Sequence, residues 1–195
     1  MKKSSLIMMI AMATLAFQSC KNGAKDSKAA ADSANVTKDT SHNSAATGGI
    51  AVDANDSKFA TTAANAGMTE VNAGKMAQEK AVSTRIKNFA TMMVNDHTKA
   101  GDELAAIAKT KNITLPPEPD ADSKKMTADM AKKSGKAFDK AYVNQMVDDH
   151  KKAVKLFEDA SQNCKDPDLK AFAAKTLPTL KMHLDSINAI HDQMK

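Results

Sequence analysis

The stretch Met-Val-Asn-Asp-His-Thr-Lys-Ala at residues 93–100 returns as Met-Val-Asp-Asp-His-Lys-Lys-Ala at residues 146–153. Six of the eight positions are identical, and one of the two differences only exchanges asparagine for aspartate. Each copy lies in a run of apolar residues spaced three and four apart, which is the spacing of an amphipathic helix. His97 and His150 occupy positions within those apolar stripes. The repeat therefore predicts two long helices that each carry a histidine into the core.

Helical patterns continue from Asp53 onward without an alternating strand pattern. They predict four long helices and one short helix: the first long helix from residue 53, the second at 82–112, the short helix at 122–133, and the last two at 136–163 and from 166 onward. Three prolines at positions 116, 117 and 119 cannot continue a helix and predict a rigid connection. Four amphipathic helices of this length can enclose one core, so the sequence predicts an all-α four-helix bundle over residues 53–195.

Local signals mark where these helices begin and where they weaken. The Asp56-Ser57 pair is expected to cap the first long helix, and Gly67 is a candidate break within it. The Asp166-Pro167 pair is a strong start signal for the last helix, with aspartate as the cap and proline at the first helical position. Pro178 lies inside that helix and is expected to kink it.

The N-terminal segment, residues 1–20, has the pattern of a lipoprotein signal peptide. Two lysines precede an apolar stretch that is too short to be a secure transmembrane span, and the stretch ends at Cys20. We expect cleavage before Cys20 and lipidation of its thiol, which makes the membrane a partner through a lipid anchor. An ordinary signal peptide cut nearby is the alternative. Residues 21–52 contain almost no large apolar side chain and are predicted to be a flexible tether.

The composition argues against a nucleic-acid-binding protein. The chain of 195 residues has a formal net charge of +5, but Arg85 is its only arginine, Tyr142 its only tyrosine, and tryptophan is absent. A surface for nucleic acid would combine clustered arginines with stacking aromatic rings. If Cys20 is lipidated, Cys164 is the only free thiol, and an intramolecular disulfide is excluded. Cys164 is expected to be a small, partly buried apolar residue.

Seven short blocks of the sequence stand in an order and at spacings shared with one bacterial family. They are Gly67–Val71, Phe89–His97, Leu115-Pro116, Phe138–Tyr142, Met146–His150, Leu177-Pro178 and His183-Leu184. Together they resemble the envelope family known as domain of unknown function 4142, over nearly all of residues 53–195. The resemblance implies a ferritin-like helical bundle that is secreted or anchored in the bacterial cell envelope, in the outer membrane or facing the periplasm. It brings no established activity.

Three histidines and one carboxylate are predicted to meet in the core. His97, His150 and His183 each fall in register with an apolar stripe, and Glu70 falls in the stripe of the first long helix. One hypothesis is a buried polar network, in which the histidines pair with Glu70 or with neighbouring aspartates and fix the register of the helices. Such a network would be structural and would need no cofactor.

The second hypothesis is a metal site. Three imidazoles and one carboxylate suit a single zinc, copper or iron ion. Di-iron bundles of the ferritin type use more carboxylates in Glu-x-x-His pairs, and neither Asp96 nor Asp149 has that spacing from its histidine, which favours the polar network. Met93 and Met146 lie one turn before the repeated histidines and are candidate soft ligands for copper, although methionine in an apolar stripe is more often core filling.

Two functions are therefore carried forward. The leading one is a non-enzymatic envelope lipoprotein, related to stress or binding a protein or a small molecule through its bundle. The alternative is a metal-binding or metal-dependent redox bundle that uses the inward-facing histidines. The sequence gives no identity for the protein or small-molecule partner.

Overall fold

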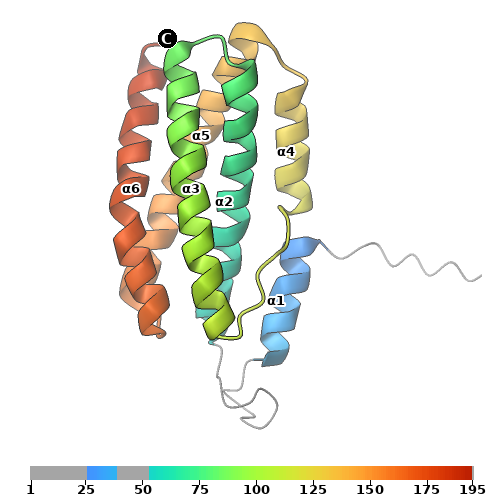
Figure 1. Ribbon diagram of the computed structural model, residues 1–195, viewed down its shortest axis with the longest axis vertical. Helices are drawn as coiled ribbons and strands as arrows, with labels where there is room; N and C mark the ends of the chain where they lie inside the picture. Colours follow the sequence, from blue (N-terminus) through green and yellow to red (C-terminus); the bar gives the residue numbers. More distant parts are fainter. Residues whose placement is uncertain (1–25, 39–52, 195) are drawn as a thin grey trace, which may run out of the picture.

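The computed structural model describes residues 26–38 and 53–194, and in these residues it contains six helices and no strand (Figure 1). The helices are α1 (Ser27–Lys38), α2 (Ala54–Lys80), α3 (Thr84–Thr110), α4 (Ala121–Ala131), α5 (Gly135–Asn163) and α6 (Pro167–Asp192). The protein is therefore all-α, as the sequence predicts. None of the described helices combines the length and the apolar composition needed to cross a membrane. The predicted signal peptide and Cys20 lie outside the described residues.

The four long helices lie side by side along the long axis of the molecule (Figure 1). α2 packs mainly on α3, and α5 packs mainly on α6. Smaller contacts join α2 to α5 and α3 to α6, so each long helix touches two others and the four close around one interior. The short α4 packs against α2 and α5. Whether the arrangement is ferritin-like in detail stays a prediction.

The helix starts agree with the sequence at α6 and differ at α2. Asp166 caps α6 as predicted, because its carboxylate accepts hydrogen bonds from the backbone N–H groups of the first turn. The cap of α2 is Asp53, so the prediction of Asp56 is wrong. The carboxylate of Asp56 instead accepts from the backbone N–H groups of Lys165 and Asp166, which ties the start of α2 to the start of α6. α2 runs through Gly67 without the predicted break.

The prediction of a flexible tether over residues 21–52 is wrong for residues 27–38, which form α1. Polar side chains hold this helix on the protein. The side-chain amide of Asn35 donates to the carbonyl oxygen of Thr114 at 2.9 Å and its oxygen accepts from the N–H of Thr114 at 2.7 Å. Asp32 accepts from the hydroxyl of Thr61 at 2.6 Å. Apolar patterning gives no sign of such docking, because it depends on hydrogen bonds and not on a stripe. Residues 21–25 and 39–52 lie outside the described part of the chain.

The apolar core has two parts, one toward each end of the bundle. We call them the Phe157 cluster, which also includes Phe59 and Phe172, and the Tyr142 cluster, which also includes Phe89 and Phe138. Cys164 is buried at the edge of the Phe157 cluster, and burial raises the pKa of its thiol to about 12. Each long helix contributes residues to both clusters. Between the two clusters, each of the four long helices contributes one buried polar side chain.

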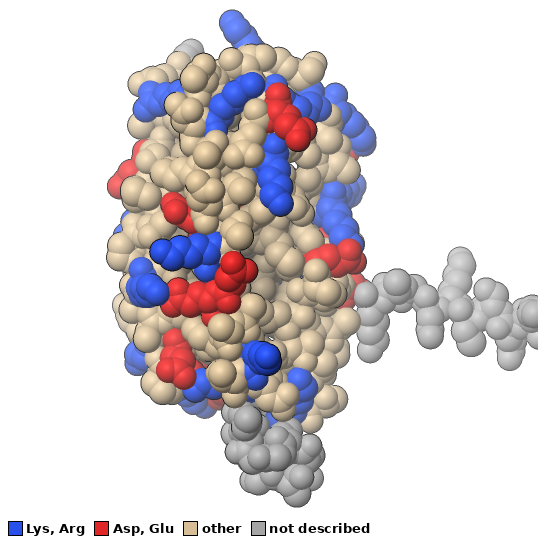
Figure 2. Space-filling model, in the orientation of Figure 1, with Lys and Arg blue, Asp and Glu red and all other residues tan. Residues whose placement is uncertain are grey.

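Charged side chains of both signs are interspersed on the face of the molecule that Figure 2 shows. Such a mixture of both signs is typical of helix faces that are simply solvated.

Candidate metal centre

One polar layer separates the two apolar clusters, and it is built from one side chain of each long helix. Glu70 comes from α2, His97 from α3, His150 from α5 and His183 from α6. His150 and His183 are fully buried, Glu70 is 2% exposed and His97 is 8% exposed. The ring centroids of the three imidazoles lie 5.3 to 5.6 Å apart, which makes a nearly equilateral triangle. The structure thus brings the four predicted groups together.

One nitrogen of each imidazole is held by an oxygen outside the triangle. Nδ1 of His97 lies 3.1 Å from Oε2 of Glu70. Nε2 of His183 lies 2.9 Å from Oδ2 of Asp96. Nδ1 of His150 lies 2.9 Å from the backbone carbonyl oxygen of Met146, one turn earlier in the same helix. A carbonyl or an ionised carboxylate only accepts, so in the hydrogen bonds of His183 and His150 the imidazole N–H is the donor. His97 and Glu70 make an ion-pair contact.

The other nitrogen of each ring is left with a lone pair. Nε2 of His97, Nε2 of His150 and Nδ1 of His183 are buried and have no hydrogen-bond partner among the described residues. Each ring offers a nitrogen that lies within 4.8 Å of those of the other two. Burial holds the pKa of all three imidazoles below the usual range, that of His97 at about 4. The rings are therefore neutral near pH 7, and their lone pairs are available.

Glu70 supports two of the three rings. Its Oε2 lies 3.1 Å from Nδ1 of His97, and its Oε1 lies 3.5 Å from Nδ1 of His150. Burial raises the pKa of Glu70 to about 7, because the charged carboxylate is removed from water. The approach of α2 to α3 that allows this contact depends on Gly74, one turn after Glu70. A Cβ at that position would lie 2.9 Å from Cγ2 of Val94 on α3.

The two aspartates of the repeat are not equivalent. Asp96 reaches across to His183 on α6. Asp149 accepts two hydrogen bonds of 2.9 Å from the side-chain amide of Gln145 on its own helix and lies 3.8 Å from Nζ of Lys152. Burial raises the pKa of Asp149, although its side chain is 20% exposed. The structure therefore brings Asp96 to the polar layer and leaves Asp149 at its edge.

Met93 and Met146 are fully buried in the Tyr142 cluster, one turn before the repeated histidines. Met146 contributes its carbonyl oxygen to the layer, through His150. A role for either sulfur as a soft ligand stays a prediction.

Two aromatic residues beside the layer were not predicted as part of the site. The Phe89 ring makes T-shaped contacts with the rings of His150 and His183, with centroid distances of 6.5 and 6.3 Å. Tyr142 is fully buried, and its hydroxyl has no partner among the described side chains and backbone. Burial, with a contribution from the charge of Glu70, raises the pKa of Tyr142. Phe89 lies two turns before His97 in the same apolar stripe. That position in the stripe is the sequence signal from which its place beside the site could have been predicted.

Comparisons with known proteins agree with the fold. A family model with the description "Domain of unknown function (DUF4142)" matches residues 38–190. The solved structure of a DUF305 fragment from Deinococcus radiodurans is similar with a TM-score of 0.63 and 10% identity, over 71% of this chain and 96% of that one. CopM in its Cu(II)-bound form is similar with a TM-score of 0.62 and 15% identity, over 72% of this chain and 97% of that one. No curated protein matches. At such identities the two structures show the fold alone.

Proposed function

The chain belongs to the family described as domain of unknown function 4142. Because that description assigns no activity, we propose a function from the site. The protein binds one transition-metal ion through His97, His150 and His183. This takes up the metal alternative of the sequence analysis. We also propose that the protein lies in the cell envelope and that its bundle is ferritin-like in detail, as the family resemblance implies.

The observation that carries the proposal is the set of three unpaired nitrogens. Metal-binding histidines commonly donate their second ring N–H to a carboxylate or a backbone carbonyl, which fixes the tautomer and turns the lone pair toward the ion. His150 and His183 have such a hydrogen-bond partner, in the carbonyl of Met146 and in Asp96, and His97 has an ion-pair contact with Glu70. The other nitrogen of each ring is unpaired, and each ring offers a nitrogen within 4.8 Å of those of the other two. The donor set therefore fits a metal ion.

A purely structural network explains this arrangement less well. Buried polar atoms without partners cost free energy, so a network that only fixes helix register should pair its members with one another. When Glu70 and Asp96 are ionised, the three inner nitrogens are all acceptors. A single water molecule has two hydrogens and can satisfy two of them at most. A cation can accept all three lone pairs.

The chemistry of the donors narrows the choice of metal. Neutral imidazole suits zinc, copper and iron. A bound ion lies about 2 Å from each histidine nitrogen, which places the nitrogens about 4 Å apart at most. The nitrogens of the three rings lie within 4.8 Å of one another, so small ring movements suffice. Copper is the first metal to test, because a structural relative is described with Cu(II) bound. Three protein ligands would leave a coordination position open.

The experiment is metal analysis of protein purified without a His tag, followed by titration of chelator-treated protein with Cu(II) and Zn(II). We expect one equivalent to bind tightly, and we expect His97→Ala, His150→Ala and His183→Ala each to lose that equivalent. His191→Ala is the matched control, because His191 is also on α6 but its side chain is 35% exposed and lies outside the layer. Wild-type protein that binds neither metal, or equal loss in the control, would refute the proposal.

We further propose that this metal site is held at the cell envelope by a lipid on Cys20. The support is the short apolar stretch that ends at Cys20, preceded by two lysines. Replacement of Cys20 by alanine should abolish labelling with fatty acid and release the protein from membranes. A variant that still labels and still fractionates with membranes would show that the lipid is not on this residue.

A further inference from the structure

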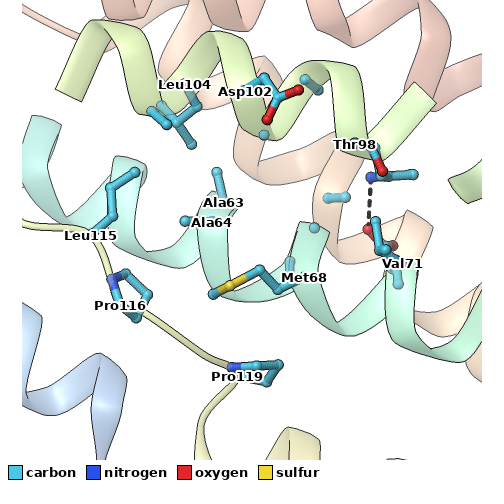
Figure 3. Close-up of a pocket in the computed structure, with 18 of the residues that line it drawn as sticks. Ala63, Ala64, Met68, Val71, Thr98, Asp102, Leu104, Leu115, Pro116 and Pro119 are labelled. Carbon is cyan, nitrogen blue, oxygen red and sulfur yellow. Dashed lines mark ion pairs between the residues drawn. The ribbon is translucent and has the colours of Figure 1, made fainter. Parts of the chain in front are cut away.

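A cavity of about 590 Å³ adjoins the polar layer, between α2, α3 and the proline-rich connection that follows α3 (Figure 3). Cavities of roughly 300 to 1,000 Å³ between the helices of a bundle are typical of sites for small molecules. The metal site proposed above does not require this volume, because a metal ion would lie among the three imidazoles. The cavity therefore needs an explanation of its own.

Small residues on the facing surfaces of α2 and α3 produce the cavity. Ala63, Ala64 and Gly67 line it from α2, and Gly101 lines it from α3. A Cβ added at Gly67 or Gly101 would meet no atom within 4 Å. The two helices approach closely at Gly74 and leave open space at Gly67, two turns earlier.

The cavity is lined mainly by apolar side chains, and Glu70 and His97 line it where it adjoins the polar layer. Leu104, Leu115 and Pro116 lie at one end in Figure 3. Val71 and Thr98 lie at the other end, beside the dashed ion pair, which is the contact of 3.1 Å between Glu70 and His97. Oε1 of Glu70 is buried and has no hydrogen-bond partner in the described part of the chain. A buried acceptor without a donor thus belongs to a residue that lines this end of the cavity.

The wall opposite α2 and α3 is fixed in place by α1. The hydroxyl of Ser27 donates to the carbonyl oxygens of Glu118 and Pro119, at 2.7 and 3.2 Å. Asn35 exchanges two hydrogen bonds with the backbone of Thr114. These contacts hold the connection on both sides of Leu115 and Pro116. The cavity is therefore preformed, which lowers the entropic cost of filling it.

We propose that this cavity binds one small aliphatic molecule whose single polar head is a hydrogen-bond donor, uncharged or cationic. The aliphatic body lies against the leucines and prolines, and the head lies toward Glu70. The charges along the cavity favour this head over an anionic one. The lining carboxylates are Glu70, Asp102 and Glu118, of which Glu118 is paired with Lys124 at 2.5 Å, and the lining cation is Lys75.

The test uses chelator-treated full-length protein and three probes that share one chain: 1-octanol, n-octylamine and octanoate. Isothermal titration calorimetry and NMR shifts should show one site for the alcohol and the amine, and an affinity for octanoate lower by about tenfold or more, equivalent to ~1.4 kcal/mol. Absence of binding by the alcohol and the amine would overturn the proposal. Equal binding of octanoate would overturn its assignment of the head. Metal binding is measured separately, so the two proposals can fail independently.

A pair of variants at Gly67 tests the location. Gly67→Leu places a side chain into the open space, and Gly67→Ala adds only one methyl group. Leucine and alanine both have a higher helix propensity than glycine, so neither variant should have a lower melting temperature than wild type. We expect Gly67→Leu to weaken octylamine and octanol binding by about tenfold or more and Gly67→Ala to change it by less than about threefold. Full binding by a folded Gly67→Leu protein would place the ligand elsewhere and overturn the proposal.

Discussion

The two copies of the repeat, on α3 and α5, share six of eight residues but support their histidines by different means. His97 depends on a neighbouring helix, because its Nδ1 is held by Glu70 of α2. His150 depends mainly on its own helix, because its Nδ1 is held by the carbonyl oxygen of Met146. The preceding aspartates differ in the same way: Asp96 reaches α6, and the hydrogen bonds of Asp149 stay within α5.

The difference shows that a repeated motif fixes where a side chain lies but not which partner it meets. α3 contacts α6, and at that contact the carboxylate of Asp96 accepts a hydrogen bond from the ring N–H of His183. α5 touches α2, whose contribution to the layer is Glu70, a carboxylate that offers no donor when it is ionised. Burial raises the pKa of Glu70, and the charge of Asp149 adds to that effect. Asp149 accordingly bonds to Gln145 at the edge of the layer.

The largest difference between the copies should appear in metal affinity. Asp96→Ala removes the oxygen that orients His183, and loss of such a partner typically lowers metal affinity by about 10- to 100-fold. Asp149→Ala leaves all three oxygen partners in place and should change affinity by less than about threefold. Competition titration against a chelator of known affinity measures both. Equal losses would show that Asp149 supports the site as Asp96 does.

The next effect concerns the dependence of the α3 copy on α2. Gly74→Ala forces a methyl group against Val94 and should destabilise the protein by about 1–3 kcal/mol. It should also separate α2 from α3 and perturb the NMR signals of His97 more than those of His150. Urea unfolding and histidine ring spectra are the measurements. Gly67→Ala is the control, because its methyl group meets no atom within 4 Å. A Gly74→Ala protein as stable as the control would show that the close approach is not tight.

A smaller difference is expected between the stabilities of the alanine variants of His97 and His150 in chelator-treated protein. His97→Ala removes the ion-pair contact of 3.1 Å from Oε2 of buried Glu70, whereas His150→Ala frees a carbonyl that already accepts a backbone hydrogen bond within α5. We expect His97→Ala to be the less stable variant by about 1 kcal/mol. The cavity left by the lost ring is of similar size in both, so the comparison removes most of that contribution. The opposite order in urea unfolding would contradict this account.

The smallest effects should come from the methionines. Met93→Leu and Met146→Leu keep the volume of the core, and each should cost less than about 1.5 kcal/mol. If both sulfurs are core filling, Cu(I) affinity should stay within about threefold of wild type. A selective loss of Cu(I) binding in one variant, with Zn(II) binding unchanged, would instead make that sulfur a ligand and distinguish the two copies further.

The sequence predicts the parts of this molecule that depend on helical periodicity. A stripe determines which side of a helix faces the core, so His97, His150 and His183 could be assigned to the interior from their register alone. The Asp166-Pro167 start of α6 is equally local. The separate roles of Asp96 and Asp149 could not be predicted, because they depend on which helix lies alongside, which is a tertiary property.

The cap of α2 and the docking of α1 escaped prediction for related reasons. Asp56 has the residue type and position of a cap, but a backbone segment more than a hundred residues later uses its carboxylate. α1 is held by side chains such as Asn35 that bond to distant backbone groups, and hydrogen bonds of that kind leave no periodic pattern.

The docking of α1 also bears on the order in which the protein folds. The hydrogen bonds of α1 and of the preceding Asp26 to residues 112–121 join positions 74 to 95 residues apart in the chain. A helix of 12 residues is only marginally stable alone, and a contact over such a separation carries a large loop-closure entropy until the intervening helices have packed. α1 is therefore the first described helix to be synthesised, but it can dock only after the connection that follows α3 is in place, so the wall of the cavity is completed after the α2–α3 pair that it covers.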